Sequence, residues 1–279
     1  MRKIFLTVFA GALASLLASA LMSGAAMAAD DGKTKPINAA SKDHPLDEVF
    51  SGYYITTPET RSMQDDDFDN PGMLYVEEGV AQWSKVDGKA GKSCQTCHND
   101  ASTSMKGVMA RYPVYYAPSK KPINVEQRIN LCRTQFMKAK PYKYESKQMQ
   151  GVTAFVGMQS RGMPVKVKVD GNMKPFFDKG KEFYYQRRGQ LNMSCAHCHE
   201  KYYGNKVRSE ILSQGMVNGY PTFRLKWQKM GSLHRRFAGC NKNIRAQPYP
   251  RGAKEYGNLE LYVRWRGEGL SVETPSVRK

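Results

Sequence analysis

The chain has 279 residues and a formal net charge of +18, and hydrophobic residues make up 41% of it. This length suits two domains of ordinary size, and the composition allows a buried core. The basic charge favours small anions or an acidic protein as partners; since no nucleic-acid-binding motif occurs, we expect no nucleic acid among them.

Residues 1–28 have the pattern of a signal peptide. Arg2 and Lys3 precede an apolar run from Ile4 to Met22, and small residues with an A-x-A site end at Ala28. The sequence therefore predicts cleavage after Ala28 and a periplasmic protein, with an uncleaved anchor as the alternative. No second stretch approaches the ~20 apolar residues of a spanning helix, so we expect no membrane span in the mature form.

Residues 29–69 are predicted to be an N-terminal leader or extension, because they are polar and rich in Pro and Asp. The part from Asp30 to Pro45 has the composition of a flexible leader. Two tandem units are predicted to follow, one over residues 70–170 and the other over residues 171–279.

The two units share landmarks at matching spacings, which indicates an internal repeat. Helix-like segments, 73–83 and 176–185, each contain a glycine 15 residues before a Cys-x-x-Cys-His motif. Further on, a Tyr-Pro pair lies 19 residues before a late cysteine in each unit. We predict a mainly α fold of two tandem cytochrome c-like domains related by internal duplication. The best strand candidate, Val165–Val169, lies at the linker.

The repeated motif is Cys94-Gln95-Thr96-Cys97-His98 in the first unit and Cys195-Ala196-His197-Cys198-His199 in the second. This spacing places two thiols where they can add to the haem vinyl groups, and the histidine that follows then binds iron. The sequence thus predicts two covalently bound haem c groups, with His98 and His199 as axial ligands. A redox thiol pair or a zinc site is the alternative, and zinc would need further ligands.

The opposite axial ligand can be methionine or cysteine. Several methionines follow each motif, but none has a counterpart in the other unit. Cys132 and Cys240 do match, since an arginine precedes each by four residues. We therefore predict thiolate ligation by both, which stabilises ferric iron. A disulfide between these two cysteines is the alternative.

The two late cysteines have different neighbours. Cys240 lies in the densely basic segment 234–245, and positive neighbours lower a thiol pKa and attract a small dianion. The neighbours of Cys132 are less basic. The asymmetry predicts an electron-transfer haem in the first unit and a reactive site in the second. His234 could shuttle a proton, although an exposed histidine is the preferred interpretation.

The chain resembles the SoxA family, the dihaem cytochrome subunits of SoxAX complexes in bacterial thiosulfate oxidation. The resemblance depends on segments that follow one another over most of the mature chain. They are Asn70-Pro71-Gly72-Met73-Leu74, Gly91-Lys92-Ser93 with the first motif, Arg128-Ile129-Asn130-Leu131-Cys132-Arg133, Ser194 with the second motif, and Arg236-Phe237-Ala238-Gly239-Cys240-Asn241-Lys242-Asn243-Ile244-Arg245-Ala246.

The resemblance implies L-cysteine S-thiosulfotransferase activity, in which thiosulfate is joined oxidatively to the carrier cysteine of SoxYZ. It implies a heterodimer with a SoxX-like monohaem cytochrome c and a downstream cytochrome c as electron acceptor. Cys240 corresponds to the catalytic cysteine, found in the family as a persulfide, and Arg236 to the substrate-binding arginine. Since a guanidinium suits a dianion, we expect thiosulfate at Arg236, with Lys242 and Arg245 as secondary candidates.

Two other functions remain possible at this stage. One is a dihaem thiosulfate dehydrogenase that releases tetrathionate without a carrier protein. The other is a non-catalytic dihaem electron carrier, in which Cys240 would only tune the potential.

Overall fold

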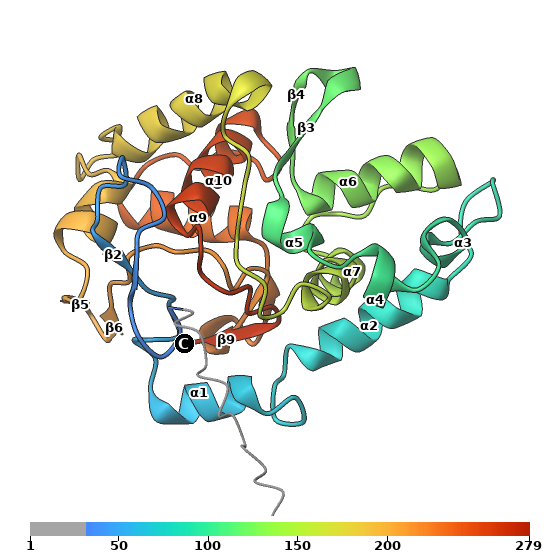
Figure 1. Cartoon of the computed structure of the whole chain (residues 1–279), viewed down its shortest axis with the longest axis horizontal. Coiled ribbons are helices and arrows are strands. Elements are labelled where there is room, and N and C mark those ends of the chain that lie inside the picture. The colour runs from blue at the N-terminus through green and yellow to red at the C-terminus, as the bar shows by residue number, and fades with distance from the viewer. Residues whose placement is uncertain (1–31) are drawn as a thin grey trace, which may run out of the picture.

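The computed structural model describes residues 32–279, so the predicted signal peptide, 1–28, lies outside the described residues. Helices dominate the described part, and the strands are short (Figure 1). This confirms the mainly α fold. No helix among residues 32–279 has both the length and the apolar character needed to span a membrane.

The first unit is built around two crossing helices, α2 (Met73–Ser84) and α7 (Lys147–Met158). The segment between them contains the first haem motif, a hairpin and a helix that leads into Cys132. In chain order the elements are α3 (Cys94–His98), α4 (Ala101–Ser104), α5 (Val108–Arg111), β3 (Val114–Tyr116), the 3-10 turn η1 (Ala117–Ser119), β4 (Lys121–Ile123), α6 (Val125–Leu131) and the π-helix η2 (Cys132–Met137).

The second unit has a similar order of elements around the crossing of α8 (Lys174–Tyr185) and α10 (Lys254–Arg266). Its hairpin gains a third strand, β9, which pairs in parallel with β7. The remaining elements are η3 (Gly171–Met173), η4 (His197–Lys201), β5 (Lys206–Val207), β6 (Glu210–Ile211), β7 (Thr222–Arg224), η5 (Leu225–Trp227), β8 (Lys229–Gly231), α9 (Leu233–Asn243) and β9 (Ser276–Arg278).

The two glycines that mark the repeat lie where these helices cross. A Cβ atom on Gly79 would come within 2.3 Å of the carbonyl oxygen of Gly151, and one on Gly180 within 2.1 Å of that of Asn258. Only glycine permits so close an approach of two helix backbones. Each crossing therefore needs the glycine that the sequence places before each haem motif.

The expected strand over residues 165–169 is wrong. The alternation is present, since Val165 and Val167 are buried between exposed lysines. However, the backbone of this segment forms hydrogen bonds with a turn rather than with another strand. Val165 exchanges backbone hydrogen bonds with Gly269 and Leu270, and the only bridge here joins Pro164 to Ser271 in the described chain. The alternation of buried and exposed side chains thus comes from an extended linker that packs against the protein on one side.

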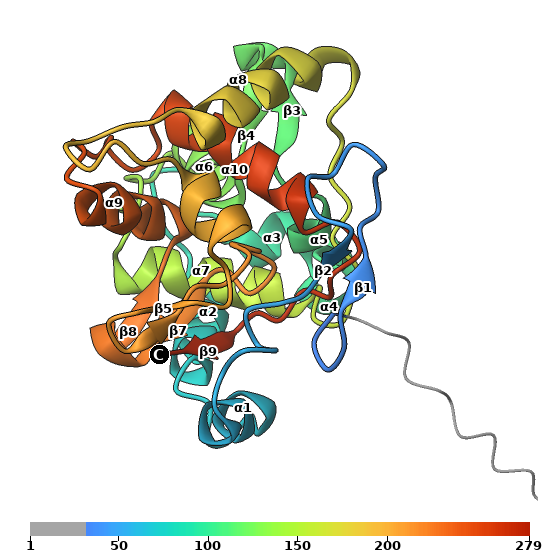
Figure 2. The same ribbon diagram turned by 90° about the vertical axis from the view of Figure 1, so that its left-hand side faces the viewer.

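The N-terminal extension packs on the second unit, so the flexible leader expected up to Pro45 is wrong for its described part. A hairpin of β1 (Ile37–Asn38) and β2 (Glu48–Val49) covers Leu270, which is fully buried. Next comes α1 (Pro58–Asp65), which lies beside β9 (Figures 1 and 2). The apolar side chains of the extension pack around Leu270 and Met216, and they are too widely spaced in the sequence to show a pattern.

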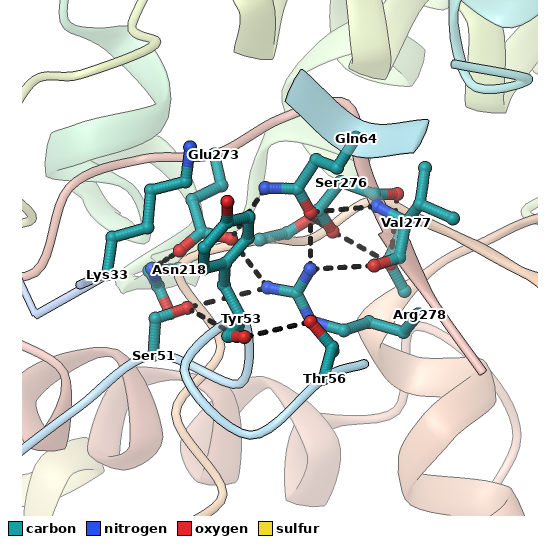
Figure 3. A network of polar contacts seen from close by, with 12 residues as sticks. Lys33, Ser51, Tyr53, Thr56, Gln64, Asn218, Glu273, Ser276, Val277 and Arg278 are labelled. Atoms are coloured by element: carbon teal, nitrogen blue, oxygen red, sulfur yellow. Dashed lines mark hydrogen bonds and ion pairs between the residues drawn. The ribbon is translucent and has the colours of Figure 1, made fainter. Parts of the chain in front are cut away.

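A polar network joins the extension to the C-terminal strand (Figure 3). The side chain of Gln64 accepts hydrogen bonds from the Val277 backbone, at 3.0 Å, and from Arg278. Arg278 also pairs with Glu273, which accepts a hydrogen bond from Asn218 at 3.2 Å. These contacts hold the extension against the part of the second unit that carries the site.

Candidate haem and thiolate site

Capping side chains begin the helices that carry the site residues. The Ser93 hydroxyl accepts a hydrogen bond from the Thr96 backbone at the start of α3, and Ser232 accepts one from Arg235 at the start of α9. Arg236 and Cys240 are four residues apart on α9, so their side chains project from the same face.

The second haem motif faces Cys240 across a cavity of about 360 Å³. Cys195, Cys198 and His199 line one part of this cavity, and Arg236 and Cys240 of α9 line another. The rest of the wall is largely apolar. The structure therefore brings together five of the residues that the sequence predicted for this site.

The imidazole of His199 is oriented as an iron ligand requires. Its Nδ1 lies 2.8 Å from the carbonyl oxygen of Ser213, so Nδ1 carries the proton and donates it. The lone pair of Nε2 is then available to a metal, the arrangement found in metal-bound histidines, and the Cys240 sulfur lies within hydrogen-bond reach of this ring. Together with two free thiols and an apolar wall, this donor set fits a covalently attached haem c.

Gly215 leaves room for the His199 ring. Its φ is +77°, and a Cβ atom there would lie 2.9 Å from Cγ of His199. We expect Gly215→Ala to displace the ring and to destabilise the holoprotein by about 1–3 kcal/mol, with a changed haem absorption spectrum. Gly204→Ala is the matched control, because Gly204 also has a positive φ, +85°, but no atom lies within 4 Å. Equal effects of both variants on the spectrum would contradict this role of Gly215.

The environment of Cys240 favours its thiolate. Burial raises the pKa of this thiol, but the Arg236 charge and a hydrogen bond with His199 outweigh burial and lower the pKa to about 7. At Cys132 burial raises the pKa of the thiol, and Arg128 offsets only part of that effect. The thiol pKa is therefore lowered at Cys240 and raised at Cys132, as the denser basic neighbours of Cys240 predict.

The arginines that precede the two cysteines also differ. Arg128 donates a hydrogen bond to the Tyr112 hydroxyl at 3.2 Å, and its guanidinium lies over the Tyr116 ring at 4.8 Å. Among the described residues, the Arg236 side chain has neither a hydrogen-bond nor an ion-pair partner, although it is largely enclosed. An unpaired guanidinium beside a thiol is suited to hold an anion there.

Lys242 and Arg245 do not join this site. Both side chains are exposed and neither lines the haem cavity. Lys242 lies two residues beyond Cys240 and so on another face of α9, whereas Arg245 follows the end of the helix. The structure therefore does not place these two secondary candidates at the wall of the haem cavity.

The basic residue that the sequence interpretation missed is Arg224. It is buried on β7, and its charge also lowers the pKa of the Cys240 thiol. The repeat could have identified it, because Arg224 ends the strand that corresponds to β3, where the first unit has Tyr116. The second unit thus has a cation at the position where the first unit has a tyrosine.

In the first unit, Cys132 lies close enough to Cys94 and Cys97 for their charges to interact. It begins the π-helix that follows α6, and the His98 ring lies 5.8 Å from the Trp83 ring. All six cysteines, each within the described region, are free thiols. The alternative disulfide between Cys132 and Cys240 is therefore absent.

Methionine is not brought to the position opposite His199. Met230 is buried between the two units, away from the haem cavity. Met216 lines the cavity but packs with Val49 and Leu270 under the N-terminal extension. The geometry favours Cys240 as the residue that faces His199.

His234 is buried, so the preferred interpretation of an exposed histidine is wrong. Its Nδ1 accepts a hydrogen bond from the Gly252 backbone at 2.9 Å, so the protonated Nε2 donates to Glu260 at 3.0 Å. The same carboxylate accepts a hydrogen bond from Asn124 of the first unit at 2.9 Å, and the Tyr144 ring stacks on the imidazole. His234 thus anchors the first turn of α9 to the first unit.

Known proteins share both the sequence and the fold. A family described as SoxA/TsdA cytochrome c domain matches residues 78–165. The L-cysteine S-thiosulfotransferase subunit SoxA of Pseudaminobacter salicylatoxidans is 49% identical over 242 residues, which cover 86% of this chain and 85% of that protein. The subunit of the same name from Rhodovulum sulfidophilum is 42% identical, over 95% of this chain and 96% of that protein.

A solved structure has a similar fold. A chain in the crystal structure of SoxXA from P. pantotrophus superimposes with a TM-score of 0.81 at 42% identity, and the match covers 84% of this chain and 89% of that chain. The fold and the Cys-x-x-Cys-His site define a c-type cytochrome. Within that class, the chain belongs to the SoxA family of L-cysteine S-thiosulfotransferase subunits.

Proposed function

We propose that this protein joins thiosulfate oxidatively to the carrier cysteine of a SoxYZ-like protein. The observation that supports this most directly is the pairing of a thiol of lowered pKa, Cys240, with the unpaired guanidinium of Arg236 at the wall of the haem cavity. The names of the relatives describe the same transfer.

The reaction balances as a two-electron oxidation. A carrier thiol and thiosulfate lose one proton and two electrons as a bond forms between their sulfur atoms, which gives a cysteine S-thiosulfonate. Arg236 would hold the dianion by its sulfonate group and orient the outer sulfur toward Cys240. Cys240, as a thiolate or with one added sulfur, would bond to the outer sulfur of thiosulfate as two electrons pass to an oxidised cytochrome c. The carrier thiol would then lose its proton and attack that outer sulfur, and the Cys240 group would leave in its starting form.

Two haems are proposed, one in each unit, 70–170 and 171–279. Cys94 and Cys97 would attach the first haem, and His98 and Cys132 would bind its iron. Cys195 and Cys198 would attach the second haem, and His199 and Cys240 would bind its iron. When bound, haem c accepts electrons one at a time and so can receive the pair that the reaction releases.

We further propose a SoxX-like monohaem cytochrome c as the partner subunit and a downstream cytochrome c as electron acceptor. The likeness to a chain of SoxXA supports the first of these. The pattern of residues 1–28 supports export to the periplasm.

Incubation of the purified holoprotein and its partner cytochrome with thiosulfate, carrier and an oxidised cytochrome c tests the function. We expect the intact mass of the carrier to increase by one thiosulfate, with two equivalents of cytochrome c reduced per carrier. Tetrathionate formed at the same rate without carrier would instead indicate a thiosulfate dehydrogenase. Absence of both products would leave only electron transfer.

A further inference from the structure

A second cavity adjoins the haem cavity on the side of the N-terminal extension. It measures about 210 Å³, and the two cavities share Ser213, Met216, Tyr220 and Arg236 in their walls. We call it the side cavity. Its other walls come from residues 52–60 of the extension, the β5–β6 turn, β7 and the C-terminal strand.

The side cavity is lined by cations and hydroxyl groups. Arg224, Arg236, Arg278 and Lys279 contribute positive charge, three threonines and two serines contribute hydroxyls, and Glu210 contributes one carboxylate. Arg278 is already paired with Glu273. Arg224 and Arg236 are close enough that the Arg236 charge lowers the pKa of Arg224, after the larger effect of burial.

Arg224 is held in place with part of its guanidinium left unused. Its Nε donates to the backbone oxygen of Lys279 at 2.7 Å, and its Nη2 donates to the same oxygen and lies 3.4 Å from a Glu210 carboxylate oxygen. Its Nη1 has no partner among residues 32–279. Glu210 also pairs with Lys226, so its single charge is divided between two cations.

The surroundings of Arg128 in the first unit differ from those of Arg236 in the second. In the first unit, Tyr116 and Tyr112 hold Arg128 by ring contact and hydrogen bond. In the second unit Arg224 stands at the position of Tyr116, so the ring that would cover Arg236 is absent. Arg224 and Arg236 are neighbouring guanidinium groups with unused donors, and the cavity screens their mutual repulsion poorly. An anion bound between them would stabilise both charges.

We propose that Arg224 acts with Arg236 to bind the sulfonate group of thiosulfate in the side cavity, which leaves the outer sulfur for Cys240. This inference rests on the proposed function and adds Arg224 as a residue that determines the affinity for the anion. The sulfonate offers three oxygens, which suit two planar forks and the surrounding hydroxyls.

Arg224→Gln is expected to raise the KM for thiosulfate about tenfold, which corresponds to the loss of one charge-assisted hydrogen bond, with kcat changed by less than about threefold. Arg224→Lys should recover part of the difference. Arg208→Gln is the matched control, because Arg208 is exposed and lines neither cavity. An unchanged KM in Arg224→Gln would overturn the inference.

Glu210→Gln separates binding from a structural role of the Arg224–Glu210 pair. If Arg224 binds the anion, removal of the competing carboxylate should lower the KM for thiosulfate by about two- to threefold. If the pair only supports the fold, Glu210→Gln should instead resemble Arg224→Gln. This variant distinguishes anion binding from a structural role even if Arg224→Gln folds poorly.

Direct titration of the holoprotein with thiosulfate, by calorimetry and without carrier, distinguishes this inference from the proposed function. Weaker binding by Arg224→Gln than by the unaltered chain supports the anion site even if no carrier is conjugated. Equal affinities would overturn the site even if the unaltered protein conjugates thiosulfate normally. Sulfate in the same titration should compete, because it shares the oxyanion chemistry.

Discussion

Replacing Cys240 with serine is expected to lower the rate of thiosulfate conjugation by a factor on the order of 10³ or more, because the reacting sulfur is removed. The measurement is the increase in the intact mass of the carrier with time. The folded state should persist, since serine is nearly isosteric with cysteine. The absorption spectrum should change as the thiolate is lost from the site that faces His199.

Cys132→Ser is the matched control for this experiment. Cys132 occupies the corresponding position in the first unit, but its thiol pKa is raised by burial and its arginine is held by Tyr112. The rate should therefore fall far less than in Cys240→Ser, while the spectrum of the first haem changes. Full conjugating activity in Cys240→Ser would refute the catalytic role and leave an electron carrier.

Glu260→Ala is expected to lower the free energy of unfolding by about 3–5 kcal/mol, because it breaks a buried polar cluster between the two units. The Glu260 carboxylate accepts hydrogen bonds from His234 and Asn124. Burial lowers the pKa of Arg264, and the Glu260 charge offsets part of that effect. Without this carboxylate, the His234 donor loses its buried acceptor, and Arg264 loses one of the two carboxylates, Glu260 and Glu126, whose charges favour its charged form. Denaturant unfolding of the holoprotein, followed by circular dichroism, measures the change.

Glu182→Ala is the control, because Glu182 is an exposed helical glutamate whose side chain has no hydrogen bond or ion pair within the described region. It should change stability by less than about 0.5 kcal/mol. Glu260→Gln should be milder than Glu260→Ala, since an amide can still accept the hydrogen bond from His234. A loss below about 1 kcal/mol in Glu260→Ala would show that the cluster does not stabilise the contact between the units.

The buried polar cluster around Glu260 also positions the candidate site. α9 carries both Arg236 and Cys240, and its first turn is tied through His234 and Glu260 to Asn124 of the first unit. The first unit therefore has a structural role besides any part in electron transfer: it positions α9, the helix that carries Arg236 and Cys240.

The sequence by itself determined the chemistry of the site. Haem attachment depends on cysteines and a histidine at fixed short spacings, and such spacings can be read without a fold. The matching cysteines could be found in the same way, because the repeat preserves landmarks such as Gly79 and Gly180, which the crossing helices require. The four-residue interval between Arg236 and Cys240 also predicts a shared helix face.

Only the tertiary structure decided which other groups surround that chemistry. The burial of His234, the packing of the extension on Leu270 and the placement of Arg224 beside Arg236 all depend on contacts between residues far apart in the chain. Charge density along the sequence pointed to Lys242 and Arg245 instead, since local composition does not record which face of a helix meets a cavity. Side-chain direction and long-range packing, rather than the number of nearby cations, determine which arginines line the site.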